Sequence, residues 1–429
     1  MATLSIEQQE LEELQEVTAS TFDTSQAEVI KPVFSTNEQT RLARLEQLET
    51  GTYVPPNSTL LTPGKNIGLN STDSISDRNE VSDNVGKIIR SVDKDNNQII
   101  IGTPNADTLY GANGDDVITS LGIDDIVSGR NGDDLISGGS GNDYLLGDAG
   151  KDIIYGDYSA SGNSDLIASS NDTIFGGDGN DKLYGQGRQD RIYGDSGDDY
   201  IEGGADNDQI NGDDGNDILY GDDIEGNADV SGDDIISGDN GNDKIYGGRG
   251  NDFLEGDDGK DLLVGGQGYD SLNGGNGNDV LIGTDTDFFG QLQQGFGFGE
   301  KDTLIGGKNN DTFVLGLEQA NARDVNGKDT VIFDVVLYND GNIKLNGTQD
   351  YALIKDFGFI NDRVTRGVDK IQLAGSASQY LLDASPVSSI SGTGIFFTPG
   401  QVVPELIGIV EGISLSNLSL SDSNQFIFV

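Results

Sequence analysis

The fold is decided by residues 176–220, GGDGNDKLY GQGRQDRIY GDSGDDYIE GGADNDQIN GDDGNDILY, in which five units of nine residues follow one another without interruption. Each unit begins with Gly, has Asp at its sixth position and has an aliphatic residue at its eighth. The pattern continues on both sides, from residue 102 to residue 314, and comprises 20 units. Three of them, at 156–175, 221–237 and 283–305, are longer than nine residues. Such a fixed period is typical of solenoid folds, in which each repeat stacks on its neighbours.

The sixth position is Asp in every unit, and the eighth is Leu, Ile or Val in all but the last, where Phe313 stands. The first position is Gly everywhere except Ser120. A general bias toward Gly and Asp does not keep one phase over 20 units, so the aspartates have a common role. They are Asp107, Asp116, Asp125, Asp134, Asp143, Asp152, Asp172, Asp181, Asp190, Asp199, Asp208, Asp217, Asp234, Asp243, Asp252, Asp261, Asp270, Asp279, Asp302 and Asp311.

The spacing of these residues predicts a short strand and a tight turn in each unit. An aliphatic residue at position eight, flanked by variable residues, is a strand with one side chain directed inward. The residues before it must turn sharply, and we expect Gly at positions one and four to supply positive φ angles. One buried aliphatic residue per unit is a thin core, so the units must stack in order to bury it.

Stacking places the carboxylates at position six close together, where like charges repel by about 4 kcal/mol per pair at 4 Å in a medium of effective dielectric near 20. The arrangement therefore requires a cation between them. Only hard oxygen ligands are present, namely carboxylates and turn carbonyls, and calcium accepts six to eight such oxygens in flexible geometry. The sequence predicts multiple calcium ions, with the 20 aspartates as metal ligands.

Composition excludes several other kinds of chemistry. The chain of 429 residues has 74 Asp and Glu against 25 Lys and Arg, a net charge of −49, and it contains neither His nor Cys. A chain this acidic repels nucleic acid and anionic lipid. Without His or Cys it cannot form an ordinary zinc site, a Ser-His-Asp triad or a thiol nucleophile.

Units such as GGDGNDKLY (176–184) and GGNGNDVLI (274–282) match the pattern GGxGxDxUx, in which U is a large aliphatic residue, and so resemble the calcium-binding nonapeptides of RTX (repeats-in-toxin) proteins. The resemblance implies a mainly β protein, a right-handed parallel β-roll in which two nonapeptides make one turn. It also implies that calcium is shared between units two apart, so that Asp181 pairs with Asp199 and Asp243 with Asp261. Ile123 and Arg188 replace the Gly of position four, and weak or missing calcium is expected there.

Three segments follow from these patterns. Residues 1–98 are expected to form an N-terminal arm, with short helices after Ser5 and Ser35 and then a linker, or to be disordered. Residues 99–315 form the roll. Residues 316–429 are expected to form a β-rich cap, with strands at 329–337 and 350–357.

The C-terminal segment also carries the expected export signal. IKDF (354–357) and DKIQL (369–373) resemble the cap of serralysin-like RTX proteins, and the chain ends in Asp422 and FIFV (426–429). This ending resembles that of substrates of the type I secretion machinery, although FIFV also suits a final buried strand. Residues 1–20 lack the basic start and apolar run of a secretory signal, and no apolar run is long enough to span a membrane. We therefore expect an extracellular or cell-surface protein.

Three functions remain open on the sequence. The first is a non-enzymatic, calcium-loaded component of the cell surface or matrix, for which cell-surface polysaccharide and copies of the chain itself both stay open as partners. The second is an adhesin that binds glycans or cell-surface polysaccharide, for which Tyr155, Tyr184, Tyr220 and Tyr246 at position nine can stack on sugar rings. The same tyrosines also suit the outer face of any strand. The third is a polysaccharide lyase or epimerase, and we expect no enzymatic activity because no carboxylate pair stands apart from the repeats.

Overall fold

The computed structural model describes residues 96–158, 170–222, 231–284, 300–315, 351–358, 368–398 and 404–429 in full. Of the strands at 81–82, 88–92, 287–288, 316–323 and 329–336 it describes the backbone. The helices expected after Ser5 and Ser35 lie outside these residues. The segment expected as a loose linker up to residue 98 contains the strands at 81–82 and 88–92, so this part of the expectation is wrong. The described residues form two compact units, which are divided between Ile245 and Tyr246. The segment boundaries expected after residues 98 and 315 remain predictions.

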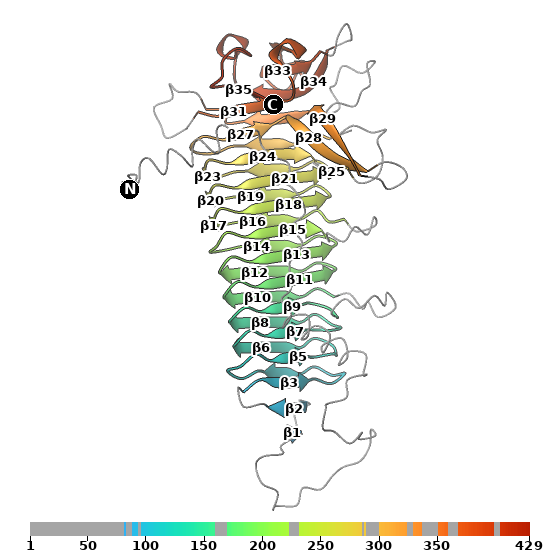
Figure 1. Ribbon diagram of the computed structural model, residues 1–429. Coiled ribbons are helices and arrows are strands. Elements are labelled where there is room, and N and C mark those ends of the chain that lie inside the picture. The colour runs from blue at the N-terminus through green and yellow to red at the C-terminus, as the bar shows by residue number, and fades with distance from the viewer. Residues whose placement is uncertain are drawn as a thin grey trace, which may run out of the picture. The chain divides into compact units, whose positions relative to one another are not determined.

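The first unit is built from two sheets of short parallel strands, and the chain alternates between them from one repeat to the next (Figure 1). Sheet 1 contains β3 (Gln98–Ile101), β5 (Val117–Thr119), β7 (Leu135–Ser137), β9 (Ile153–Tyr155), β11 (Lys182–Gly187), β13 (Tyr200–Ala205) and β15 (Ile218–Asp222), preceded by antiparallel β1 (Val81–Ser82) and β2 (Ile88–Val92). Sheet 2 contains β4 (Thr108–Tyr110), β6 (Ile126–Asn131), β8 (Tyr144–Ala149), β10 (Thr173–Asp178), β12 (Arg191–Ser196), β14 (Gln209–Asn211) and β16 (Ile235–Ser237). The short strand β17 (Asn240–Gly241) follows, and β18 (Lys244–Arg249) contains the boundary between the units.

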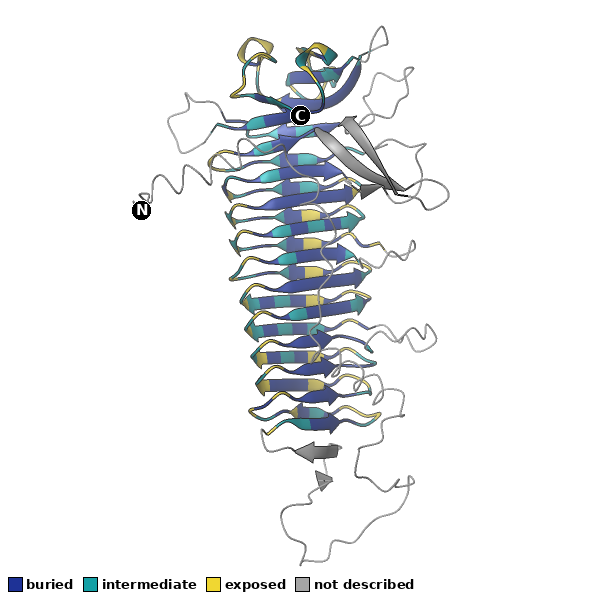
Figure 2. Ribbon diagram, viewed as in Figure 1, coloured by how far each residue is buried: buried dark blue, intermediate teal, exposed yellow. Residues whose placement is uncertain are grey.

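The register of the strands gives the number of repeats in a turn. Lys182 of β11 lies opposite Tyr200 of β13, and Arg191 of β12 lies opposite Gln209 of β14. Each pair is 18 residues apart, so two nonapeptides make one turn of the roll, as the resemblance to RTX repeats implied. Figure 2 shows the consequence for packing, since buried residues run along the strands of both sheets.

The core consists of the position-eight residues. Every one of the 20 has an exposed fraction of 0%, from Leu109 to Phe313. This confirms the prediction of one inward side chain per repeat. At about 25 cal/mol per Å² of apolar surface, a core of single aliphatic residues stabilises each unit only slightly, which is why the repeats depend on their neighbours.

The second unit also contains two sheets of parallel strands, and one of these sheets ends in antiparallel strands. One sheet contains β21 (Leu262–Gln267), β24 (Val280–Thr284), β27 (Thr312–Val314), β31 (Lys370–Leu373) and β35 (Phe426–Phe428). The other contains β19 (Phe253–Glu255), β22 (Ser271–Asn273), β26 (Thr303–Ile305), β30 (Ala352–Lys355), β34 (Glu405–Glu411), β33 (Gly392–Phe397) and β32 (Tyr380–Ala384). Smaller elements are β20 (Asp258–Gly259), β23 (Asn276–Gly277), β25 (Asp287–Phe288), β28 (Gly316–Arg323), β29 (Asp329–Val336) and the single 3₁₀ turns Ala377–Gln379 and Leu415–Asn417.

The cap changes from parallel to antiparallel pairing. β30 and β31 still pair in parallel with β26 and β27, whereas β34 pairs antiparallel with β33, and β33 with β32. Tyr351, Leu406 and Ile409 form a small core between these strands. The terminal FIFV contributes β35, which pairs in parallel with β31 and buries Phe426. The ending is therefore a strand of the cap, whatever further role it has in export.

Candidate metal centre

The position-six aspartates form a ladder along each side of the roll. The backbone N–H of Asp181 donates to Oδ1 of Asp199 at 2.7 Å, and the N–H of Asp199 donates to Oδ1 of Asp217 at 2.8 Å. On the other side, the N–H of Asp190 donates to Oδ1 of Asp208 at 2.8 Å. One oxygen of each of these carboxylates is thus held by the turn before it. This brings Asp181 and Asp199 together as predicted, whereas the predicted pair Asp243 and Asp261 has one member in each unit and remains a prediction.

The second carboxylate oxygen, Oδ2, has no hydrogen-bond donor in much of the ladder although it is buried. Such an oxygen is costly, because a buried acceptor without a donor loses about 1–3 kcal/mol of hydration, and more if it is charged. The residues concerned include Asp143, Asp172, Asp181, Asp190, Asp199, Asp208, Asp217 and Asp270. A row of buried, unsatisfied hard oxygens is the arrangement that a hard cation would satisfy.

The glycines at position one border the space beside these oxygens. A Cβ at Gly194 would lie 2.5 Å from Oδ2 of Asp199 and 2.6 Å from the carbonyl oxygen of Gly212. Carboxylate and carbonyl oxygens therefore flank a space that only glycine leaves open. Both carboxylate and carbonyl oxygens are hard ligands of the kind that binds calcium in proteins.

Burial makes the ionised form of these aspartates unfavourable in the protein alone. Burial, and after it the charges of neighbouring aspartates, raise the pKa of Asp199 to about 9 and that of Asp208 to about 10. The backbone N–H that each Oδ1 accepts acts in the opposite direction but does not compensate. A bound divalent cation would restore the ionised form, because it supplies the opposite charge that the ladder lacks.

The turn geometry corrects one expectation. Positive φ angles occur at positions two and four, as at Gly177 (φ 108°) and Gly179 (φ 150°), and not at position one. A Cβ at Gly179 would overlap the carbonyl oxygen of Gly150 in the preceding turn. Position one is glycine for a different reason, the close approach to Oδ2 and to the next turn. The exception, Ser120, uses its hydroxyl to donate to the carbonyl of Gly138 at 2.6 Å.

The ladder is different at its beginning. Oδ2 of Asp107 accepts the N–H of Thr103 at 2.5 Å, and Oδ2 of Asp116 accepts the N–H of Ala112 at 2.6 Å. These carboxylates are already satisfied within their own turns. Among the predicted ligands they are the least suited to bind a cation.

At its other end the ladder has a member that the sequence analysis did not assign. Asp369, in DKIQL, accepts the N–H of Asp311 with Oδ1 at 3.1 Å and the N–H of Gly358 with Oδ2 at 2.5 Å. Its spacing from Lys370 and Ile371 repeats the Asp-x-aliphatic pattern of the roll, and this could have identified it. Because the protein supplies a donor to both oxygens, Asp369 ends the ladder without an open ligand.

The two turns with unusual residues at position four behave differently. Oδ2 of Asp125, next to Ile123, accepts the N–H of Gly122 at 3.4 Å, which fits the weaker calcium site expected there. Arg188 is exposed, with φ 75°, and the charges that act on Asp190 are those of Asp172 and Asp157. Burial raises the pKa of Asp190 to about 9, so this carboxylate resembles its neighbours, and the weaker calcium binding expected beside Arg188 remains a prediction.

No group of three or more acidic side chains converges on one point within the described residues. This follows from the architecture, because each repeat contributes one ladder carboxylate and the other oxygens come from the backbone. The residues that would hold calcium are therefore the ladder aspartates with open Oδ2 atoms, together with turn carbonyls. When bound, the ion supplies positive charge between turns that would otherwise repel.

Three of the four tyrosines considered for sugar stacking are buried and not available for it. Tyr155, Tyr184 and Tyr220 have exposed fractions of 8%, 8% and 4%, and the rings of Tyr155 and Tyr184 stack on each other at 4.8 Å. Tyr246 is half-buried. The outer face of sheet 1 is thus a packed aromatic surface, and a glycan site has to be sought elsewhere.

Parallel two-sheet stacking with a buried aspartate ladder defines a calcium-binding β-roll. Comparison with protein families agrees, since the model of the RTX calcium-binding nonapeptide repeat matches residues 94–127, 128–157, 168–201, 193–223, 230–263, 255–286 and 296–317. The chain therefore contains RTX nonapeptide repeats, which bind calcium and are typical of proteins secreted by the type I machinery. No curated protein matches the chain in sequence. Within the part of the chain that the structure describes, no helix has the length and apolar character needed to cross a bilayer.

Proposed function

We propose that this protein is a secreted, non-enzymatic calcium-binding component of the cell surface or extracellular matrix, which folds when it meets calcium outside the cell. The observation that supports this most directly is the row of buried Oδ2 atoms without donors. A carboxylate with this environment opposes folding until a cation binds, so the binding free energy of calcium becomes folding free energy.

The same property would serve export. At low cytosolic calcium the aspartates of the ladder repel one another and the chain remains open enough to be threaded through a transporter. Outside the cell, calcium near millimolar is sufficient for sites of the affinity typical of extracellular modules, about 10⁻⁴ to 10⁻³ M. The chain would therefore be open at low calcium and folded at high calcium. The ladder residues, the turn glycines and the net charge of −49 would all contribute to this dependence of folding on calcium.

Localisation of the native protein tests the proposal. We expect antibody labelling of intact cells at their surface or in the surrounding matrix, and release of the protein into the medium by a calcium chelator. Retention in the cytosol would contradict the proposal. Incubation with alginate or pectin, with products read by mass spectrometry, tests the absence of enzymatic activity, and the appearance of unsaturated oligosaccharides would contradict it.

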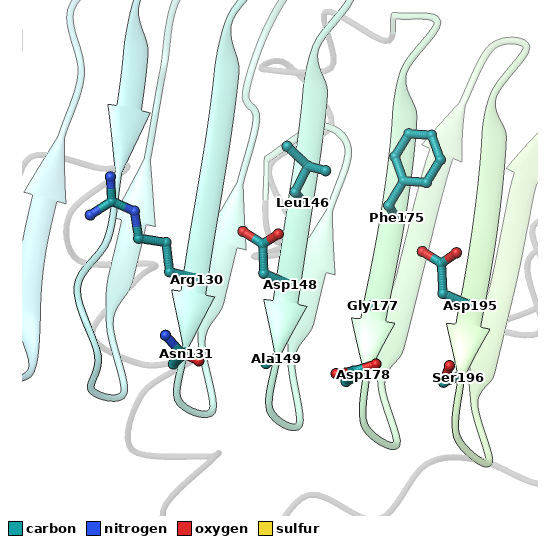
Figure 3. A pocket seen from close by; sticks show the side chains of 10 residues that line it. All are labelled: Arg130, Asn131, Leu146, Asp148, Ala149, Phe175, Gly177, Asp178, Asp195 and Ser196. Carbon is teal, nitrogen blue, oxygen red and sulfur yellow. The ribbon is translucent and has the colours of Figure 1, made fainter.

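A groove on the outer face of sheet 2 favours a second candidate, binding of a polysaccharide. It has a volume of about 610 Å³ and is crossed by β6, β8, β10 and β12 (Figure 3). Phe175, whose ring stacks on Tyr193 at 4.8 Å, offers a partly exposed aromatic face. Arg130, Asp148 and Asp195 supply charged hydrogen-bonding groups around it. Aromatic faces with a few convergent polar groups are typical of sites that bind small molecules and sugars.

Matched variants of the calcium-loaded protein test this candidate. Phe175→Ser should weaken binding of a soluble polysaccharide measured by calorimetry. Phe253→Ser should not, because Phe253 is an exposed aromatic residue outside the groove. Equal binding by both variants and the unaltered protein would show that the groove does not bind polysaccharide. The proposal of calcium-dependent folding would not be affected.

A further inference from the structure

One buried carboxylate next to the ladder does not belong to the nonapeptide pattern. Asp157 stands at position two of the first longer unit, 156–175, and has an exposed fraction of 4%. Its Oδ1 accepts the hydroxyl of Ser170 at 2.8 Å. Its Oδ2 is buried and accepts no hydrogen bond. Asp157 therefore has the same unsatisfied oxygen as the ladder aspartates, although it does not stand at position six.

The backbone explains why this side chain is buried. At position two of neighbouring units φ is positive, as at Asp148 (71°) and Gln186 (76°), and Asp148 is exposed. Asp157 is not among the residues with positive φ. Its carbonyl instead accepts the hydroxyl of Ser137 at 3.0 Å. The start of the longer unit is thus turned so that the carboxylate of Asp157 lies inside the roll.

Asp157 lies among consecutive members of one ladder. The charge of Asp172 acts on Asp157, and that of Asp157 acts on both Asp143 and Asp190. The hydroxyl of Ser170 interacts with Asp172 as well as with Asp157. The space bordered by position-one glycine is also present here, since a Cβ at Gly156 would lie 2.5 Å from Oδ2 of Asp172 and 2.8 Å from the carbonyl oxygen of Gly185.

We propose that Asp157 is an additional calcium ligand, so that the repeat of Asp172 contributes two buried carboxylates to the ladder where an ordinary repeat contributes one. The inference rests on the calcium-binding function of the ladder proposed above. Calcium affinity rises with the number of charged ligands and with the rigidity of the site. The site at the seventh unit should therefore bind calcium more tightly than its neighbours.

The residue at position two differs between the two ladders. In the ladder that contains Asp172, position two is Thr103, Leu121, Gly139, Asp157, Gln186, Gly204, Asp222, Gly248, Gly266 or Thr284. It is acidic only at Asp157 and Asp222, and each of these residues opens a longer unit. In the other ladder position two is Asp in five units, as at Asp148 and Asp195, and φ is positive there. Asp157 differs from these residues because it lacks the positive φ and its Oδ2 is buried without a donor.

The test uses the full chain with Asp157→Asn, which retains an oxygen that can accept the Ser170 hydroxyl but removes the charge. The matched control is Asp206→Asn, the same change at an exposed residue on the same side of the roll. Two quantities are measured for each protein: the number of calcium ions bound at saturation, by equilibrium dialysis, and the calcium concentration that gives half of the β signal in circular dichroism.

We expect Asp157→Asn to bind about one ion fewer, or to lose its tightest class of sites by about tenfold in affinity, while the control matches the unaltered protein. An unchanged ion count and midpoint would overturn the proposal, and a lower melting temperature alone would assign Asp157 to hydrogen bonding with Ser170. If the Asn variant does not fold in excess calcium, Asp157→Ser provides the same comparison. Failure of the unaltered protein to bind calcium would refute the proposed function itself.

Discussion

At the scale of single residues, the two oxygens of a ladder aspartate have separate roles. Oδ1 of Asp199 accepts the N–H of Asp181 and fixes the register of the turns, while Oδ2 faces a space lined by hard oxygens. The first role is satisfied by the protein and the second only by a cation. This division explains how one residue per repeat can both stack the turns and make the stack depend on calcium.

Replacing an aspartate in the middle of the ladder should therefore cost more than replacing one at its beginning. Asp199→Ala leaves the buried N–H of Asp181 without its acceptor, a loss of about 1–3 kcal/mol, and removes an oxygen from the sites on both sides. Asp107→Ala removes a carboxylate whose Oδ2 is already satisfied by Thr103. Thermal melting in saturating calcium should show the larger fall for Asp199→Ala, and equal falls would contradict this account of the ladder.

The raised pKa values predict that acid can partly replace calcium. Burial raises the pKa of Asp199 from 3.8 to about 9 and that of Asp208 to about 10. A folded-state pKa above the unfolded value means that the folded protein binds more protons between about pH 4 and 9, so its metal-free stability falls as the pH rises through this window. Metal-free protein should show more β signal at pH 5 than at pH 8.

The matched variant for this experiment is Asp199→Asn, which resembles the protonated side chain and should reduce the dependence on pH. In saturating calcium the direction should reverse, since protons then compete with the ion for the carboxylates. A metal-free β signal that rises with pH, or that does not change, would show that the ladder carboxylates do not control folding.

Single residues also show what the sequence could and could not predict. Positions six and eight were predictable because each has one physical requirement that recurs in all 20 units. Position six needs a carboxylate in the ladder, and position eight needs a buried apolar side chain. Asp157 was missed because position two of the repeat is acidic in several units and only the structure shows which of these carboxylates is buried. Asp369 was missed because it follows the last repeat, although its Asp-x-aliphatic spacing carried the signal. The tyrosines at position nine were ambiguous because strand propensity does not say whether an outer face is covered.

At the scale of the turn, glycine is required for two distinct reasons. Positions two and four need positive φ, which Asp, Gln and Arg also adopt in some units, whereas position one needs the absence of a side chain. The sequence predicted glycine-dependent turns but assigned the wrong reason to position one. The need for positive φ and the need for a missing side chain both appear as Gly in the repeat, so only the three-dimensional structure distinguishes them.

This distinction predicts that a glycine variant can damage the metal site without removing a ligand. In Gly194→Ala the new Cβ would lie 2.5 Å from Oδ2 of Asp199 and 2.6 Å from the carbonyl of Gly212. We expect a higher calcium requirement for folding, measured as the midpoint of a calcium titration followed by circular dichroism. Gln209→Ala, a change at an exposed strand residue, is the control. Equal midpoints for the two variants would mean that the space beside Gly194 is not a ligand site.

At the scale of the whole molecule, export and folding are expected to be linked through the C-terminal segment. Residues 316–429, fused to a reporter, should leave cells that carry a type I transporter, because the ending with Asp422 and FIFV resembles the signal of such substrates. Deletion of residues 370–429 should abolish export of the full chain. If deletion of residues 1–98 abolishes export and deletion of 370–429 does not, the signal lies at the other end.

The central claim is that calcium completes the fold, and a calcium titration of the metal-free full chain at neutral pH tests it most directly. Far-ultraviolet circular dichroism should show a coil-like spectrum without metal, a strong β signal on addition of calcium, and a cooperative melting transition of the loaded protein. Magnesium at the same concentration should not replace calcium, because it keeps its waters and requires a tighter octahedron. The same β content with and without metal at neutral pH would contradict the account, and full rescue by magnesium would contradict the assignment to calcium.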